Sequence, residues 1–70
     1  MKRLNIIGCG NVGKSLARLL TQNNALAIGD IVNRSLESSS EAVKFIGNGK
    51  AVSTISAMRP AELYLIGTTD

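Results

Sequence analysis

The sequence predicts an α/β fold, half of a doubly wound domain, in which a parallel sheet with strand order 3-2-1-4 carries helices packed on it. Short runs of large apolar side chains alternate with segments of helical periodicity, and a glycine-rich turn joins the first run to the first helical segment. Strands that alternate with helices form parallel sheets through right-handed crossovers, so the helices cover the faces of the sheet. Because a doubly wound domain continues with further elements, we expect residues 1–70 to be the N-terminal part of a longer, truncated domain.

The first strand and the first helix lie on either side of the glycines. Residues 3–7 are rich in large apolar side chains and end at Gly8, which is typical of a buried strand that opens a fold. Apolar residues then recur at the spacing of one helix face, and the pair Asn23-Asn24 marks the helix end. The residues expected to pack this helix on the sheet are Val12, Leu16, Leu19 and Leu20.

The rest of the chain repeats this alternation. Residues 25–32 form a second apolar run, and Ser35 can cap a helix that ends at Gly47. The predicted inner face of that helix consists of Ser39, Ala42, Val43 and Ile46. The remaining expected elements are a short third strand near Ala51 and Val52, a helical turn at 55–58 closed by Pro60, and a fourth strand at 63–66.

The composition excludes several classes of protein. The chain is 44% hydrophobic with a net charge of +3, and its basic residues are scattered rather than clustered, so we expect no nucleic-acid binding. With no histidine and a single cysteine, it predicts no metal site and no Ser-His-Asp catalysis. The apolar run after Lys2 and Arg3 stops at Gly8, too short for a signal peptide or a membrane span, so we expect a cytoplasmic protein that binds no membrane.

The glycine-rich turn fits two phosphate-binding patterns. As Gly8-x-Gly10-x-x-Gly13 it is the dinucleotide fingerprint, whose glycines allow a tight turn and let a pyrophosphate approach the backbone. As Gly8-x4-Gly13-Lys14-Ser15 it is a P-loop, in which the lysine reaches the terminal phosphates and the serine binds magnesium. Either pattern places an anion at a helix N-terminus.

The end of the second strand favours the dinucleotide interpretation, with NADP(H) as cofactor and NAD(H) less favoured. In such folds the residue that contacts the adenosine ribose lies about 20 residues beyond the last glycine. Asn33, Arg34 and Ser35 hold that place, and none of them is acidic. The Arg34 guanidinium can pair with a 2′-phosphate, and the other two side chains add neutral hydrogen-bonding groups. Asp30 lies inside the strand, where it is poorly placed to reach a ribose.

The P-loop interpretation lacks support downstream. A GTPase also needs an Asp-x-x-Gly element and a base-reading Asn-Lys-x-Asp, and neither string occurs between residues 16 and 70. The dinucleotide interpretation is therefore preferred. A GTPase-like fragment and a non-catalytic, nucleotide-responsive binding or assembly module are kept as alternatives.

Three strings, "NIIGCGNVGKSLARLL", "IVNRS" and "ELYLIGTTD", resemble the NADP-binding Rossmann domain of the pyrroline-5-carboxylate reductase and 6-phosphogluconate dehydrogenase-like superfamily. The resemblance implies the N-terminal half of a Rossmann domain from an oxidoreductase. The implied pyrophosphate contacts are Gly8, Gly10, Asn11, Val12 and Gly13, and the implied 2′-phosphate contacts are Asn33, Arg34 and Ser35. Thr68 and Thr69 would lie near the pyrophosphate and the nicotinamide-side ribose.

The resemblance also limits what this chain is expected to do. Members of the superfamily complete their catalytic site with a helical C-terminal domain, so we expect residues 1–70 alone not to be catalytic, and no catalytic residue is identified. The apolar strand at 63–66 would form an exposed sheet edge. Because proteins usually cover such edges, we expect a homodimer or a segment-exchanged assembly through this strand.

Overall fold

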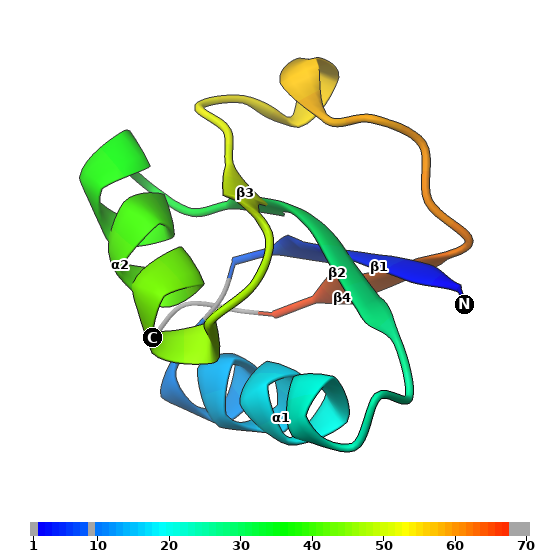
Figure 1. The fold of residues 1–70 in the computed structure, drawn as a ribbon. Helices are drawn as coiled ribbons and strands as arrows, with labels where there is room; N and C mark the ends of the chain where they lie inside the picture. The colour runs from blue at the N-terminus through cyan, green and yellow to red at the C-terminus, as the bar shows by residue number, and fades with distance from the viewer. Residues whose placement is uncertain (1, 9, 68–70) are drawn as a thin grey trace.

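The computed structural model describes residues 2–8 and 10–67, and these form a four-stranded parallel sheet with order β3-β2-β1-β4 (Figure 1). The predicted strand order is confirmed, and the architecture is that of a Rossmann-like half-domain. The elements are β1 (Arg3–Ile7), α1 (Asn11–Gln22), β2 (Ala27–Val32), α2 (Leu36–Ile46), β3 (Lys50–Ala51), the 3-10 turn η1 (Ile55–Ala57) and β4 (Leu63–Ile66).

The two faces of the sheet are covered differently. Helices α1 and α2 lie together on one face, while the segment that connects β3 to β4, with η1 in it, crosses the other face (Figure 1). Strand order reverses at β1, because β2 and β3 add on one side of it and β4 adds on the other. In open α/β sheets, ligands bind at the carboxyl ends of the strands at such a reversal.

The hydrophobic core lies between the sheet and the two helices. It is formed by the buried residues Leu4, Ile6, Ala17, Ile28, Ile31, Ala42 and Ile46. Alternate side chains of a strand point to opposite faces, so Leu4 and Ile6 face the helices, whereas Arg3 and Asn5 face the crossover segment.

A β-bulge in β2 lies opposite Asn5. Leu4 pairs with Ile28 and Ile6 pairs with Ile31, so Gly29 and Asp30 together oppose one residue of β1. The buried Asn5 amide oxygen accepts a hydrogen bond of 2.8 Å from the Asp30 N–H, replacing the ladder bond lost at the bulge. A Cβ at Gly29 would collide with the Asn5 and Arg3 side chains, so the bulge requires a glycine there.

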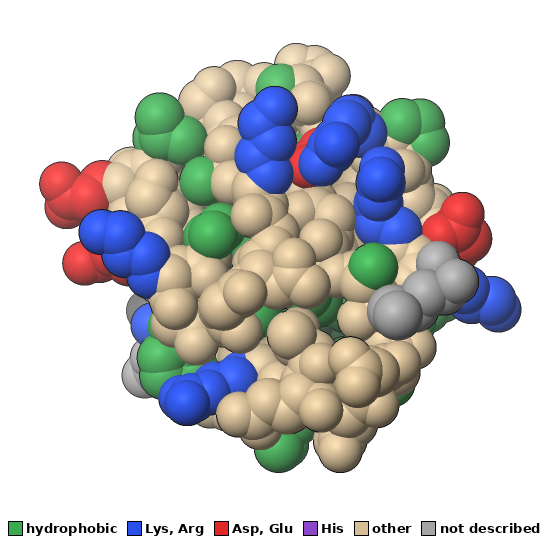
Figure 2. Space-filling view, in the orientation of Figure 1, with side chains coloured by type: hydrophobic (Ala, Val, Ile, Leu, Met, Phe, Trp, Pro, Cys, Tyr) green, Lys and Arg blue, Asp and Glu red, His purple; other side chains and the backbone are tan. Residues whose placement is uncertain are grey.

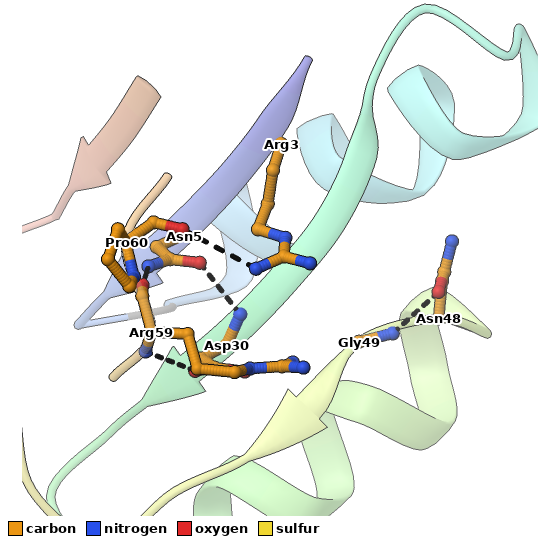
Figure 3. A network of polar contacts seen from close by, with 7 residues as sticks. All are labelled: Arg3, Asn5, Asp30, Asn48, Gly49, Arg59 and Pro60. Carbon is orange, nitrogen blue, oxygen red and sulfur yellow. Dashed lines mark hydrogen bonds and ion pairs between the residues drawn. The ribbon is translucent and has the colours of Figure 1, made fainter. Parts of the chain in front are cut away.

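The crossover segment is anchored to this bulge by Arg59 (Figure 3). The Asp30 carboxylate is 1% exposed and accepts 2.7 Å hydrogen bonds from both the Arg59 backbone N–H and its Nη2. Asn5 Nδ2 donates to the Arg59 carbonyl at 2.6 Å. These hydrogen bonds from Arg59 hold the pKa of Asp30 below its ordinary value, even though burial acts in the opposite direction.

Both predicted caps of α2 are confirmed. The Ser35 hydroxyl accepts a 3.1 Å hydrogen bond from the Ser38 N–H at the start of the helix, and Gly47 ends the helix in the left-handed region at φ 83°. The predicted inner face is also confirmed, with Ser39, Ala42 and Ile46 buried.

The structure differs from the sequence-based expectations at several element boundaries and surfaces. Strand β2 begins at Ala27 rather than at residue 25, because Ala25 donates to the Leu20 carbonyl in the turn that follows α1. Strand β3 begins one residue early, at Lys50, and ends at Ala51. Val52 lies just beyond it and donates one backbone hydrogen bond to the Ile31 carbonyl.

Helix α1 packs on the core through Leu20, as expected, but not through Leu16 or Leu19. Leu16 and Leu19 are exposed, whereas Ala17 is fully buried and Leu20 is partly buried beside it. The side chain of Val12, the fourth expected residue, lies outside the described part of the helix. Because successive helix residues are rotated by about 100°, a buried face centred near Ala17 includes Leu20 but leaves Leu16 and Leu19 outside it. Tyr64 is half exposed on β4.

Candidate functional site

Three segments meet at the carboxyl edge of the sheet, where strand order reverses. The Gly8 N–H donates to the Val32 carbonyl at 2.8 Å, and the Gly67 N–H donates to the Ile7 carbonyl, also at 2.8 Å. The ends of β1, β2 and β4 are therefore level with one another. As a result, the glycine loop lies between the segment after β2 and Gly67, which follows β4.

The turn after β1 depends on a close contact between two glycines. Gly8 has φ 74°, a conformation that residues with a side chain rarely adopt. A Cβ on Gly8 would lie 2.5 Å from the Gly67 carbonyl oxygen, and a Cβ on Gly67 would collide with the Gly8 carbonyl oxygen. The backbone course of the loop therefore requires glycine at both positions, and Gly67 was not identified from the sequence motif.

The N-terminus of α1 has the form of an anion-binding site. Gly10 occupies the N-cap position, no side chain caps the helix, and no acidic residue lies in its first turn. The first helical hydrogen bond runs from the Lys14 N–H to the Gly10 carbonyl at 2.9 Å, so the N–H groups of residues 11–13 have no partner within the helix. A Cβ at Gly10 would meet nothing within 4 Å, so the space beside this backbone is open.

The other residues of the predicted pyrophosphate set lie at this helix start. Asn11 and Val12 are the first two residues of α1, and the structure describes only their backbone. Gly13 follows them in the first turn. Cys9, Thr68 and Thr69 lie outside the described residues.

The segment Asn33-Arg34-Ser35 follows β2 at the same edge, and its two outer residues are tied to α2. The Asn33 backbone N–H donates to Ser39 Oγ at 2.8 Å, and its side-chain Nδ2 donates to Ser38 Oγ at 3.1 Å. Ser35 accepts from the Ser38 N–H through its hydroxyl and from Ser39 Oγ through its carbonyl. The Ser35 hydroxyl proton is left available, since its oxygen acts only as an acceptor in the cap.

Arg34, between these two residues, is exposed and makes no hydrogen bond, ion pair or ring contact within the described part of the chain. The other arginines have partners: Arg3 donates to the Pro60 carbonyl, Arg18 lies over the Phe45 ring and Arg59 pairs with Asp30. A guanidinium has five N–H donors and a permanent charge, so Arg34 is well suited to an external anion.

The geometry gives no support to the P-loop interpretation. The Lys14 ammonium lies 5.5 Å from the centroid of the Phe45 ring on α2, a cation–π contact that gives it a partner within the protein. Asp30, the one candidate for a magnesium-binding aspartate of β2, is taken up by Arg59. Lys14 therefore has a structural role in joining α1 to α2.

On the face of the molecule drawn in Figure 2, basic side chains do not follow a single stripe. Figure 2 shows Lys and Arg gathered at the top of the view, on the side of the crossover segment, with acidic atoms visible between them, and further basic side chains spaced apart elsewhere. In residues 2–8 and 10–67, no group of three or more His, Cys, Asp or Glu could hold a metal ion. None of the helices in these ranges has the length and hydropathy needed to cross a membrane.

The sequence pattern places Ser39 on the inner face of α2 but does not connect it with the segment after β2. The available signal was a hydroxyl on an otherwise apolar helix face, four residues after the N-cap. A buried hydroxyl needs a hydrogen-bond partner, and at that position the partner is the backbone just before the helix.

Comparison with known proteins agrees with this architecture. A family described as NADP oxidoreductase, coenzyme F420-dependent, matches residues 3–69. No curated protein matches the chain. The crystal structure of a Bacteroides fragilis protein described as an NADP oxidoreductase is similar, with a TM-score of 0.84 and 24% sequence identity over 99% of this chain. That likeness shows the fold, and this chain spans about a quarter (26%) of the length of that protein.

Proposed function

Because the chain belongs to the family of coenzyme F420-dependent NADP oxidoreductases, we propose that its carboxyl-edge site binds NADP(H) in preference to NAD(H). Membership of the family confirms the prediction of a nucleotide-binding oxidoreductase domain, with a nicotinamide dinucleotide as its class of cofactor. It is compatible with the resemblance to pyrroline-5-carboxylate reductase without singling out that enzyme.

We propose that the pyrophosphate binds the loop and helix start formed by Gly8, Gly10, Asn11, Val12 and Gly13. The support is that the α1 N-terminus is uncapped by any side chain and that the space beside Gly10 is open. A helix start with free N–H groups attracts a diphosphate through hydrogen bonds and the helix dipole. Thr68 and Thr69, which follow Gly67 in the sequence, are proposed to contact the pyrophosphate and the nicotinamide-side ribose.

The observation that carries the choice of NADP is Arg34. It is an exposed arginine with no partner among the described residues, at the place where this fold reads the adenosine ribose, and neither Asn33 nor Ser35 beside it is acidic. An acidic residue there would accept a hydrogen bond from the 2′-hydroxyl of NAD and would repel a 2′-phosphate. We propose that Arg34 pairs with the 2′-phosphate and that Asn33 and Ser35 flank it.

The whole protein is proposed to be an oxidoreductase. When bound, the nicotinamide supplies or accepts the hydride, and the protein supplies position and electrostatics. The family description also names coenzyme F420, so we propose hydride transfer between NADP(H) and that coenzyme as the reaction. The residues of this chain hold the cofactor for that step, and none of them is proposed to be catalytic.

The test is a calorimetric titration of the folded chain with NADPH, NADH and Mg-GTP in parallel. We expect NADPH to bind more tightly than NADH, and Arg34→Ala to weaken NADPH binding by about 10- to 100-fold while NADH binding changes little. Lys44→Ala is the matched control, because it removes one exposed positive charge from the far end of α2.

Two outcomes would contradict the proposal. If NADPH and NADH bind with equal affinity, and Arg34→Ala leaves both affinities unchanged, then Arg34 does not contact a 2′-phosphate. Magnesium-dependent binding of GTP that is lost in Lys14→Ala would instead establish the P-loop alternative.

We also propose that the chain forms a homodimer, or exchanges segments, through β4. This strand pairs only with β1 in the described sheet, and Leu63, Tyr64 and Ile66 are 42%, 50% and 71% exposed. A flat apolar edge with no charged residue within the strand pairs readily with a second copy of itself. Pairing about a two-fold axis would cover the edges of both copies at once.

A further inference from the structure

We propose that Ser39 is a positioning residue that determines the preference for NADP over NAD, by fixing the backbone on both sides of Arg34. This inference rests on the proposed function, since it assigns Arg34 to the 2′-phosphate. Ser39 is fully buried and lies on α2, one turn beyond the segment that it holds. It is therefore placed to act on the site without touching the cofactor.

The Ser39 hydroxyl joins the residues on either side of Arg34. It accepts a 2.8 Å hydrogen bond from the Asn33 backbone N–H and donates its own proton to the Ser35 carbonyl at 3.1 Å. A hydroxyl has one proton and two lone pairs, so both bonds form at the same time. The chain before Arg34 and the chain after it are thereby held by one oxygen atom.

Neighbouring contacts strengthen the same arrangement. Asn33 Nδ2 donates to Ser38 Oγ at 3.1 Å, and the Ser35 hydroxyl accepts from the Ser38 N–H. Arg34 is thus the one residue of Asn33-Arg34-Ser35 whose side chain has no partner within the described chain. The backbone on either side of Arg34 is held by the two hydrogen bonds of the Ser39 hydroxyl. Pre-organisation of this kind lowers the ordering cost when a guanidinium binds an anion.

The surroundings of Ser39 explain why a hydroxyl matters there. The rest of the buried face of α2 is apolar, formed by Ala42 and Ile46, and an alanine at 39 would fit the same space. Without the hydroxyl, the Asn33 N–H would lose its 2.8 Å partner. Because a buried N–H that loses its acceptor costs free energy, we expect the segment that carries Arg34 to shift until this N–H finds another acceptor.

The test is the ratio of NADPH to NADH affinity in Ser39→Ala, measured by calorimetric titration of the folded chain. We expect the ratio to fall by about 3- to 10-fold, because NADPH loses affinity while NADH, which shares the pyrophosphate contacts, does not. A loss of stability alone would weaken both ligands equally and leave the ratio unchanged. Ser40→Ala is the matched control on the same helix, because Ser40 makes no hydrogen bond outside the helix backbone in the described chain.

A double-mutant cycle with Arg34→Ala completes the test. If Ser39 acts through Arg34, then Ser39→Ala has no further effect on the ratio once Arg34 is gone. If Ser39→Ala does not fold, Ser39→Cys keeps the same branching with a somewhat larger and more weakly hydrogen-bonding group, and it carries the same expectation.

The outcomes separate this inference from the function beneath it. A wild-type chain that binds NADPH and NADH equally overturns the proposed function itself. A wild-type chain that prefers NADPH, with the same preference in folded Ser39→Ala, overturns only the role of Ser39.

Discussion

At the scale of single residues, Asp30 is a buried carboxylate whose role is structural. Its buried carboxylate accepts hydrogen bonds from the Arg59 backbone and guanidinium, and its N–H is held by Asn5. The Arg59 side chain is 52% exposed, so water screens its side of the pair. The sequence indicated that Asp30 lies inside a strand and away from the ribose. The partner could not be inferred, because Arg59 lies 29 residues away in a crossover of irregular structure.

The lowered pKa of Asp30 predicts how stability depends on pH. The folded chain releases the Asp30 proton more readily than the unfolded chain, so stability from this group is complete above the ordinary pKa of 3.8 and is lost as the pH falls toward the lowered value. We expect the free energy of unfolding in urea to decline below about pH 5. Asp30→Asn should cost about 1–3 kcal/mol at pH 7 and flatten that decline.

Glu62 provides the control for this pH dependence. The Arg3 backbone N–H holds the pKa of Glu62 below its ordinary value, so this exposed carboxylate acts in the same direction. Because it is exposed, Glu62→Gln should leave most of the decline in place. A decline of equal steepness in wild type and Asp30→Asn would show that other groups govern acid unfolding.

At the scale of elements, the caps and the strand order could be predicted from sequence, whereas the packing face of α1 could be predicted only in part. Ser35 and Gly47 act through local backbone geometry, which a sequence displays directly. For α1, the periodicity of leucines indicated Leu16 and Leu19, yet the helix contacts the sheet through Ala17. A hydrophobic pattern ranks side chains by apolarity and carries no information on how closely a helix axis approaches a sheet.

The residues of the candidate site also fall into those that the sequence predicts and those that it does not. The glycine motif and the segment after β2 are local signals, so Gly8, Gly10 and Arg34 could be proposed from sequence. Gly67 and Ser39 matter only through contacts with segments distant in the chain or across a helix turn, so the sequence motif did not reveal them.

The contact between the ends of β1 and β4 predicts different results for two glycine variants. Gly67→Ala places a Cβ against the Gly8 carbonyl, so we expect a loss of about 1–3 kcal/mol in stability and weaker binding of both NADPH and NADH. Gly10→Ala places its Cβ in open space, so we expect nearly unchanged stability but weak binding, because the methyl group occupies the approach to the helix start. Denaturant unfolding and titration of both variants test this. A Gly67→Ala chain with wild-type stability and affinity would show that the loop accommodates the methyl group.

At the scale of the whole molecule, the two edges of the sheet differ. The β3 edge is two residues long and carries Lys50, and short charged edges resist pairing with another chain. The β4 edge is four residues long, apolar and exposed. Self-association through the sheet is therefore expected at β4 and not at β3.

Tyr64→Lys tests this expectation directly. Tyr64 lies within β4 opposite Asn5, away from the glycine loop, so a lysine there charges the edge without altering the proposed cofactor contacts. We expect light scattering to give twice the chain mass for the wild type at high concentration and the single mass for Tyr64→Lys. Ile55→Lys, on the exposed turn η1, introduces the same charge elsewhere and should leave the dimer intact. A wild-type chain that stays monomeric at high concentration, or a dimer that Ile55→Lys disrupts as fully as Tyr64→Lys, would show that β4 is not the interface.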